Sequence, residues 1–272
     1  TNLKQLDINI DKSSYILFGN KSAVQKMRKL IESNPLSLNN QVIKEKLSEK
    51  YLGDYIHNNG LIESTKTTVN ERYWRVMSSI LEIKTIVQDY RNNHNGGIMT
   101  GIDLWEMSVI PSLLNNAGTW NDIDTETMKK LNNLQNTLLR YLLMTPRTTP
   151  IPSLSWEFGI LPIKYRIMIK KLCLVKHIKS LNEGSLAKEI IETQQKFSFP
   201  GLAAEAKQII HDLKLPNILN NDINEEYSKL KWKKIVKEEI WKRCEKDLKE
   251  EIKKLEKLSE SNMSDESFKT KN

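Results

Sequence analysis

The stretch that decides the fold is VNERYWRVMSSILEIKTIVQDY, residues 69–90. Its apolar residues recur at alternating intervals of four and three: Val69, Tyr73, Val76, Ile80, Ile83, Val87 and Tyr90. This spacing places them on one face of an α-helix that packs lengthwise against another element. We therefore expect a long helix from residue 66 that stops at the breaker NNHNGG, residues 92–97.

Helical patterns continue through the middle of the chain. Residues 102–116 predict a helix that Pro111 kinks or divides, because proline lacks a backbone N–H. Asp124 is suited to cap a third helix, because its side chain can accept a hydrogen bond from a free N–H of the first turn. The apolar face of that helix comprises Met128, Leu131, Leu134, Leu138 and Leu142.

Four of the eight prolines fall in residues 145–167, which we interpret as an irregular connector. Pro162 stands where proline commonly opens a helix, so the next helix is expected over residues 162–181. This helix should be buried on two sides. One side carries Ile163, Ile167, Leu174 and Ile178, and the other carries Met168, Leu172 and Val175.

The same helix is strongly basic. Its positively charged residues are Lys164, Arg166, Lys170, Lys171, Lys176 and Lys179, and no acidic residue lies among them. Two interpretations stay open. The residues form a nucleic-acid interface, or their apolar stems lie along a buried helix while the charged ends reach solvent.

A last long helix is expected over residues 225–258. Its core-facing residues would be Trp241, Cys244, Leu248, Ile252 and Leu255. The final residues, 259–272, read SESNMSDESFKTKN. They are polar and charged with few apolar positions, so we expect disorder there.

The first part of the chain differs, because β-branched and aromatic residues predict short strands. Residues 5–19 suggest one or two strands around a turn at Asp11, and a short helix follows with Ser22 as its N-cap. Residues 36–56 predict a hairpin that turns at the asparagine pair 39–40. Gly53, in the strand-like stretch EKYLGDYI, is typical of a bulge or of the close approach of another backbone.

These patterns predict an α+β protein that is mainly α. A small β-hairpin unit, residues 1–62, would precede a helical domain over residues 63–182, with a helical linker or tail over residues 183–258. Within that tail we expect a long basic C-terminal helix. Hydrophobic residues make up 39% of the chain, which is enough to bury a core.

The charge balance favours a polyanionic partner. Lys and Arg number 42 against 34 Asp and Glu, which gives a formal charge of +8 and a pI near 9.2. No apolar run is long enough for a membrane span. Cys173 and Cys244 stand alone, which predicts buried thiols in a reducing compartment inside the cell, the nucleus or the cytoplasm.

The sequence contains none of the common catalytic signatures. We find no G-x-S-x-G, no glycine-rich phosphate loop, no H-E-x-x-H and no C-x-x-C. Asp122 and Asp124 are explained more simply by helix capping than by metal binding. We therefore expect that this chain alone is not a complete enzyme, and we identify no cofactor and no small-molecule substrate for it.

Five segments, taken in order, resemble the C-terminal part of the reverse transcriptases of non-LTR (LINE-like) retrotransposons. The resemblance covers residues 1–180. The segments are INIDKSSYILFG (8–19), EKYLGDYIHNNG (49–60), VIPSLLNNAGTW (109–120), LQNTLLRYLLMTP (134–146) and WEFGILPIKYRI (156–167).

The resemblance implies roles for the N-terminal residues. Residues 1–62 would be the end of the palm, with Lys12 near the phosphates of the incoming nucleotide as an accessory proton donor. The plain alternative is an exposed lysine that protects an edge strand. KYLGDYI would be the primer grip, whose contacts with the primer end come from Lys50, Tyr51, Leu52 and Gly53.

The resemblance also implies partners. Residues 63–182 would be the thumb, which follows RNA or an RNA–DNA duplex through its backbone, with Lys164, Arg166, Lys170 and Lys171 as further contacts. The catalytic aspartates and their Mg²⁺ would lie in palm and fingers upstream in the parent polypeptide, because this chain has no aromatic-x-Asp-Asp motif. The alternative is a non-enzymatic helical RNA-binding or assembly protein derived from such an element.

Overall fold

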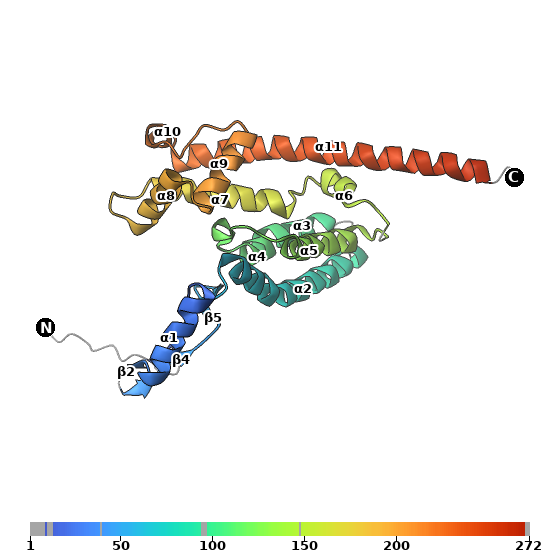
Figure 1. The fold of residues 1–272 in the computed structure, drawn as a ribbon. Coiled ribbons are helices and arrows are strands. Elements are labelled where there is room, and N and C mark those ends of the chain that lie inside the picture. The colour runs from blue at the N-terminus through green and yellow to red at the C-terminus, as the bar shows by residue number, and fades with distance from the viewer. Residues whose placement is uncertain (1–8, 10–12, 39, 94–96, 147, 270–272) are drawn as a thin grey trace.

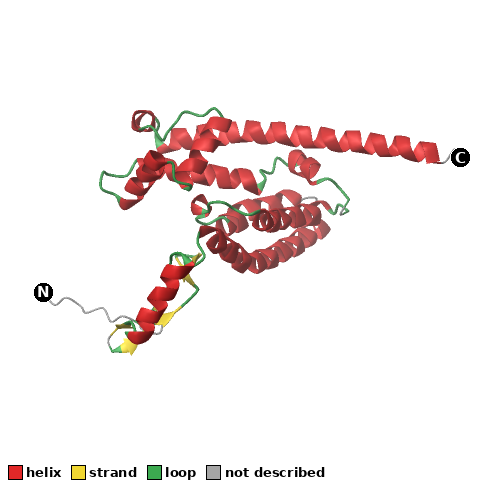
Figure 2. Ribbon diagram, in the orientation of Figure 1, coloured by secondary structure: helices red, strands yellow, loops and turns green. Residues whose placement is uncertain are grey.

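The computed structural model describes residues 9, 13–38, 40–93, 97–146 and 148–269. Helices account for 68% of the structure and strands for 7%. The strands all precede the first long helix (Figure 2). This confirms the predicted α+β class with mainly α structure.

The N-terminal unit pairs short strands around one helix. Its elements are β1 (Ser14–Tyr15), α1 (Lys21–Ser33), β2 (Ser37–Leu38), β3 (Gln41–Val42), β4 (Lys44–Glu45), β5 (Ser48–Tyr51) and β6 (Asp54–His57). β1 pairs with β4 in parallel, whereas β2–β3 and β5–β6 are antiparallel hairpins. Asn40, with φ 62°, lies in the first hairpin turn as predicted. The turn predicted at Asp11 lies outside the described residues.

The N-cap of α1 is Asn20, and the prediction of Ser22 was wrong. The Asn20 side chain accepts a hydrogen bond of 2.8 Å from the backbone N–H of Ala23. The helix begins at Lys21, so Ser22 already lies within the first turn. An asparagine side chain satisfies the free N–H groups of a helix start as well as serine does.

A helical layer follows the N-terminal unit (Figure 1). It comprises α2 (Leu61–Asn93), α3 (Ile98–Leu104), a π-helical segment (Trp105–Val109), α4 (Ile110–Leu113), a 3₁₀ turn (Ala117–Thr119) and α5 (Thr125–Leu143). The next helix, α6 (Ile151–Glu157), lies between this layer and the last helix of the chain (Figure 1). The predicted α2 face is buried at Val69, Val76, Ile80, Ile83 and Val87. Tyr90 at its end is 44% exposed, so the buried face ends earlier than predicted.

Pro111 divides the predicted helix 102–116, which begins earlier than expected, at Ile98. The π-helical segment stands directly before α4, because the proline ring would clash with the carbonyl of Met107 in a regular helix. Gly101 lies where α3 crosses α2 and α5. A Cβ there would lie 2.8 Å from Cγ2 of Val87 and would also overlap the Leu142 side chain, so a larger residue would force these side chains to shift.

For residues 124–161, the structure confirms the predicted helix cap but not the predicted irregular connector. Asp124 caps α5, because its side chain accepts from the backbone N–H of Thr127 at 2.7 Å. The connector predicted as irregular contains α6. Pro150 and Pro152 stand at the start of that helix, where no backbone N–H is needed, so the prolines begin a helix there rather than prevent one.

Buried apolar side chains of the described residues form two clusters that meet at α7 (Ile163–Lys179). Ile163 and Ile167 belong to the first cluster, whereas Leu172 and Val175 belong to the second. The helix is therefore buried on two sides, as predicted. Leu174 and Ile178, which we assigned with Ile163, pack instead against the second cluster.

The second cluster is built with α8 (Leu186–Phe197), α9 (Leu202–Asp212) and α11 (Lys229–Lys269), and α10 (Asn221–Glu226) lies against α7. α11 lies along α7 and continues beyond α6 (Figure 1). Its buried residues are Trp232, Val236, Ile240, Cys244 and Leu248. The predicted Trp241 is 40% exposed, because its neighbour Ile240 faces the core.

α11 also extends to Lys269, into the segment for which we predicted disorder. Residues 259–268, SESNMSDESF, contain neither glycine nor proline, so no breaker ends the helix there. Among the described residues, no helix has both the length and the apolar character needed to cross a membrane.

Candidate nucleic-acid interface

The stretch EKYLGDYI forms most of the β5–β6 hairpin, with Leu52 and Gly53 as its two-residue turn. Leu52 has φ 49° and Gly53 has φ 91°, the pair of positive values of a type I′ turn. The placement of Gly53 inside a strand was therefore wrong. Glycine is needed because the turn requires a positive φ; a Cβ would meet its nearest neighbour, Nδ2 of Asn115, at an ordinary 3.6 Å.

The tip of this hairpin exposes two apolar side chains. Leu52 is 76% exposed and Tyr51 is 63% exposed. The register pairs Tyr51 with Asp54 and Tyr55 with Lys50, so the two tyrosines lie on opposite faces. Their spacing of four positions would place them on one face of a continuous strand, but the turn falls between them.

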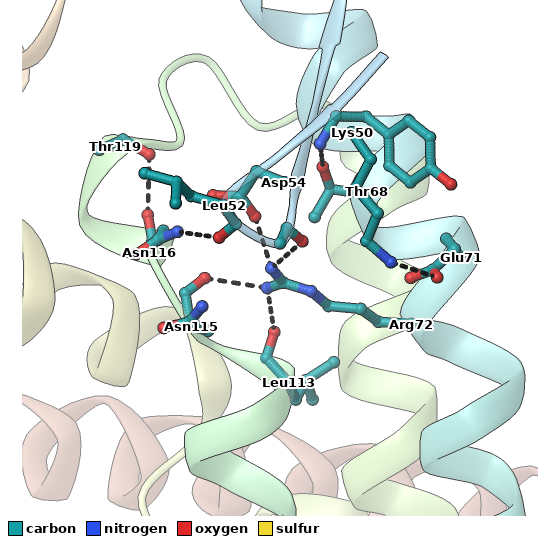
Figure 3. Close-up of polar contacts among 12 residues, drawn as sticks. Lys50, Leu52, Asp54, Thr68, Glu71, Arg72, Leu113, Asn115, Asn116 and Thr119 are labelled. Atoms are coloured by element: carbon teal, nitrogen blue, oxygen red, sulfur yellow. Dashed lines mark hydrogen bonds and ion pairs between the residues drawn. The ribbon is translucent and has the colours of Figure 1, made fainter. Parts of the chain in front are cut away.

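Arg72 of α2 fixes the hairpin turn to the helical layer (Figure 3). Its guanidinium donates to the carbonyl oxygens of Gly53 at 2.8 Å and of Leu113 and Asn115 at 2.9 Å each. It also forms an ion pair with Oδ1 of Asp54 at 2.5 Å. These contacts join the hairpin, α2 and the end of α4, and we call them the Arg72 clamp.

The Arg72 side chain at the centre of the clamp is buried. The Arg72 side chain is 2% exposed, and the ring of Trp120 lies 5.7 Å from its guanidinium carbon. Burial lowers the pKa of Arg72, and the carboxylate of Asp54 opposes that shift. A buried guanidinium with so many acceptors holds the turn in one position, since each donor direction is fixed by the planar fork.

Two more contacts hold the hairpin along α2. The backbone N–H of Tyr55 donates to Oγ1 of Thr68 at 2.8 Å, and Lys50 pairs with Glu71 at 2.8 Å (Figure 3). The hydrogen bond from Lys50 is the main reason that the pKa of Glu71 lies below its ordinary value. Lys50, a predicted contact residue, is therefore tied to α2.

The loop after α4 connects the hairpin tip to α7. Nδ2 of Asn116 donates to the carbonyl oxygen of Leu52 at 3.3 Å. Two residues later, a Cβ on Gly118 would lie 3.0 Å from the carbonyl oxygen of Lys170, so the loop packs tightly on α7. The two predicted groups, at the hairpin and on α7, are thus joined through residues 116–118.

The predicted basic residues of α7 have unequal surroundings. Arg166 is paired with Glu106, with Nη1 at 2.7 Å from Oε2, and Lys171 is paired with Glu205 of α9. Lys164 is exposed, with its ammonium 4.6 Å from the ring centre of Tyr165. Lys170 is half-buried and has no acidic partner among the described residues.

Lys176 and Lys179 also contact other residues of the fold. The sequence alone left two interpretations of their charge open. Lys176 donates to the carbonyl oxygen and side chain of Asn224, and Lys179 pairs with Glu192 at 3.2 Å. Both lysines are buried. Their charged ends therefore bind within the fold and do not reach solvent, whereas the second interpretation expected them to reach it.

Lys12, which the resemblance implies as an accessory proton donor, lies outside the described residues. A cavity of about 380 Å³ opens between the hairpin, α2 and the loop after α4, with Tyr51, Tyr55 and Trp120 in its lining. No group of histidine, cysteine, aspartate or glutamate side chains suited to a metal ion occurs within the described part of the chain.

The central residue of this interface, Arg72, was not singled out from the sequence. It falls between Val69 and Val76 on the apolar side of the α2 pattern, and an arginine at such a position is a signal of a buried polar contact. Its partners lie 18 to 43 positions away in sequence, so a single sequence does not identify them.

The arrangement offers an exposed apolar tip on a fixed backbone, with Lys50 on the strand that leads to it. Such a surface can contact sugar and backbone groups of a nucleic acid without reading bases. Comparisons with protein-family models, with curated proteins and with solved structures gave no match to this chain.

Proposed function

We propose that this chain is the primer-grip and thumb portion of a retroelement RNA-directed DNA polymerase, and that it holds RNA–DNA duplex. The observation that carries the proposal is the hairpin tip. Leu52 adopts a left-handed backbone conformation and is 76% exposed, while its turn is fixed by the Arg72 clamp.

The energetics of Leu52 support a role in contact with a partner. A leucine in the left-handed region costs about 1–2 kcal/mol, and an exposed side chain recovers little of that by burial. Asparagine at this position would suit a type I′ turn better. A residue that is locally unfavourable and does not pack within the fold is typical of a functional surface.

The N-terminal unit supports a proposed palm partner. α1 contains no buried residue, and large apolar side chains of this unit are exposed: Phe18 by 58%, Met27 by 47% and Leu30 by 60%. Exposed apolar groups on one small unit are typical of an interface. In the proposal, palm and fingers of the parent polypeptide cover them and supply the catalytic aspartates with their Mg²⁺.

The cysteines favour an intracellular location, the nucleus or the cytoplasm. Cys173 and Cys244 are free thiols, and Cys244 is 1% exposed. Burial raises the pKa of Cys244 to about 11, so this thiol stays protonated and unreactive at neutral pH. Free thiols of this kind are typical of proteins in a reducing compartment.

α11 favours a second candidate, a non-enzymatic RNA-binding or assembly protein. Apolar residues continue on this helix after Leu248, the last buried position up to residue 257, with Ile252 partly buried and Leu255 39% exposed. Two such helices could pair along this face. Sedimentation over a range of concentrations tests this candidate, since assembly predicts association that does not need nucleic acid.

Binding of a labelled RNA–DNA duplex tests the first candidate. Leu52→Asn keeps the type I′ turn but removes the apolar tip, and the matched control is Val42→Asn, in the neighbouring hairpin, where Val42 is 60% exposed. We expect about tenfold weaker binding for Leu52→Asn, the equivalent of about 1.4 kcal/mol, and no change for the control. Equal affinities for Leu52→Asn and wild type would refute the primer-grip role.

A further inference from the structure

α7 and α11 enclose a second surface, a groove of about 710 Å³. Lys170 of α7 and Lys233 and Lys237 of α11 line it. Cys173 lies in the same groove, and Trp241, which is 40% exposed, lies in its wall. We call it the α7–α11 groove.

Several other basic residues on the same two helices are paired with carboxylates. On α7, Lys171 pairs with Glu205 and Lys179 with Glu192; on α11, Lys234 pairs with Glu238 and Lys246 with Glu250. Within the described residues, Lys170, Lys233 and Lys237 have no acidic partner.

The acidic residue that lines the groove does not neutralise them. Both carboxylate oxygens of Glu106 are bound by the guanidinium of Arg166. Lys233 and Lys237 are four residues apart on one helix, an arrangement in which like charges repel. The groove therefore holds positive charge that the fold does not balance.

The pKa shifts of Lys170 and Cys173 agree with an excess of positive charge in the groove. Burial lowers the pKa of Lys170, and the charge of Lys233 lowers it further. Burial raises the pKa of the Cys173 thiol, although all three lysines act in the opposite direction. The thiol therefore supplies no negative charge at neutral pH, and a bound anion would relieve the repulsion among the lysines.

We propose that the α7–α11 groove binds the phosphate groups of a single nucleic-acid strand, with Trp241 placed for a base or sugar. Lysines from two helices together with an exposed aromatic ring are typical of single-strand binding surfaces. The position fits the proposed function, on which this inference rests. Lys170 contacts the loop at Gly118, and that loop also holds the hairpin tip through Asn116.

The first test compares two double variants of the full chain. Lys233→Gln with Lys237→Gln removes groove charges, whereas Lys234→Gln with Lys246→Gln removes the same charge from paired, exposed positions of the same helix. Affinity for a labelled single-stranded RNA is measured between about 50 and about 200 mM salt. We expect the salt dependence of log K to fall by about 1.4 for the groove variant, since each phosphate contact contributes about 0.7.

The paired-lysine variant should retain the wild-type salt dependence. An equal decrease of the salt dependence in both double variants would show that only net charge matters and would overturn the proposal. Unchanged binding in the groove variant would overturn it as well. The groove variant removes a like-charge pair, so it is expected to fold at least as well as wild type.

The second test uses Cys173 as a probe inside the groove. Alkylation of Cys173 is measured with and without the RNA strand, and the buried Cys244 serves as the unreactive reference. We expect protection by the strand in wild type and in the paired-lysine variant, but not in the groove variant. Protection by inorganic phosphate at equal ionic strength, without further protection by RNA, would identify a free-phosphate site and overturn the strand proposal.

Leu52→Asn separates this inference from the proposed function. If both proposals are right, this variant loses duplex affinity but keeps the protection of Cys173 by single-stranded RNA. Loss of duplex affinity in this variant, with no Cys173 protection even in wild type, would refute only the groove. Protection without any duplex binding in wild type would refute only the primer grip.

Discussion

Replacing Arg72 by methionine tests the contacts that hold the hairpin on the helical body. Methionine keeps much of the volume of the side chain but removes every donor. Three carbonyl oxygens lose a hydrogen bond, those of Gly53, Leu113 and Asn115, and the carboxylate of Asp54 loses its ion-pair partner.

The expected decrease in the free energy of unfolding follows from the surroundings of each acceptor. The bond to Leu113 is buried, so its carbonyl oxygen stays unsatisfied, at a cost of about 1–3 kcal/mol. The bonds to Asn115, Gly53 and Asp54 are only partly buried, so water can reach these groups. Breaking a buried ion pair costs about 3–5 kcal/mol, and we expect about 3 kcal/mol here, at the lower end.

Denaturant unfolding, followed by far-UV circular dichroism, measures this loss. Arg75→Met is the matched control on the same helix, because Arg75 is 58% exposed and its contact with Glu71 is 3.7 Å long. We expect less than about 1 kcal/mol for the control. A loss below about 1 kcal/mol for Arg72→Met would refute the clamp as a major contributor to stability.

Three further predictions concern packing, capping and chemistry. Gly101→Ala should destabilise the fold by about 1–3 kcal/mol in chemical denaturation, because the clash with Val87 and Leu142 exceeds the gain in helix propensity; a more stable variant would contradict this. Asp124→Ala should cost about 1 kcal/mol by loss of the α5 cap. The backbone N–H of Thr127 holds the pKa of Asp124 below its ordinary value, so the contribution is complete above about pH 4 and is lost as the pH falls further. Unfolding curves of wild type and variant should therefore converge in acid, and a constant difference would count against the cap. Finally, gel analysis should show no primer extension by the chain alone with Mg²⁺, nucleotides and primed RNA; extension would contradict the assignment of the catalytic carboxylates to another part of the parent polypeptide.

The sequence alone predicts those features of the structure that depend on local periodicity and on helix capping. The buried face of α2 follows from the spacing of residues 69–87, and the start of α5 follows from Asp124. Asn40 likewise marked the turn of the first hairpin. In each case the physical cause lies within a few residues of the feature it determines.

Features that depend on distant partners were missed or misplaced. The acidic partners of α7 come from other elements: Glu106 for Arg166 and Glu205 for Lys171. The sequence of α7 alone therefore shows its positive charges but not the carboxylates that pair with them in the fold. On α11, the predicted Cys244 and Leu248 are buried, but Ile240 occupies the core position that we assigned to Trp241.

The measurement that tests the account most directly is a crosslink from the hairpin tip to nucleic acid. Leu52→Cys, in a Cys173→Ser background, carries a photoreactive group, and Val42→Cys carries the same group as the control. The substrate is an RNA–DNA duplex with a recessed DNA 3′ end. We predict crosslinks from residue 52 at the terminal nucleotides of the recessed strand and few from residue 42. Crosslinks spread evenly along the duplex, or equal yields from both positions, would contradict the claim that this hairpin holds the primer end.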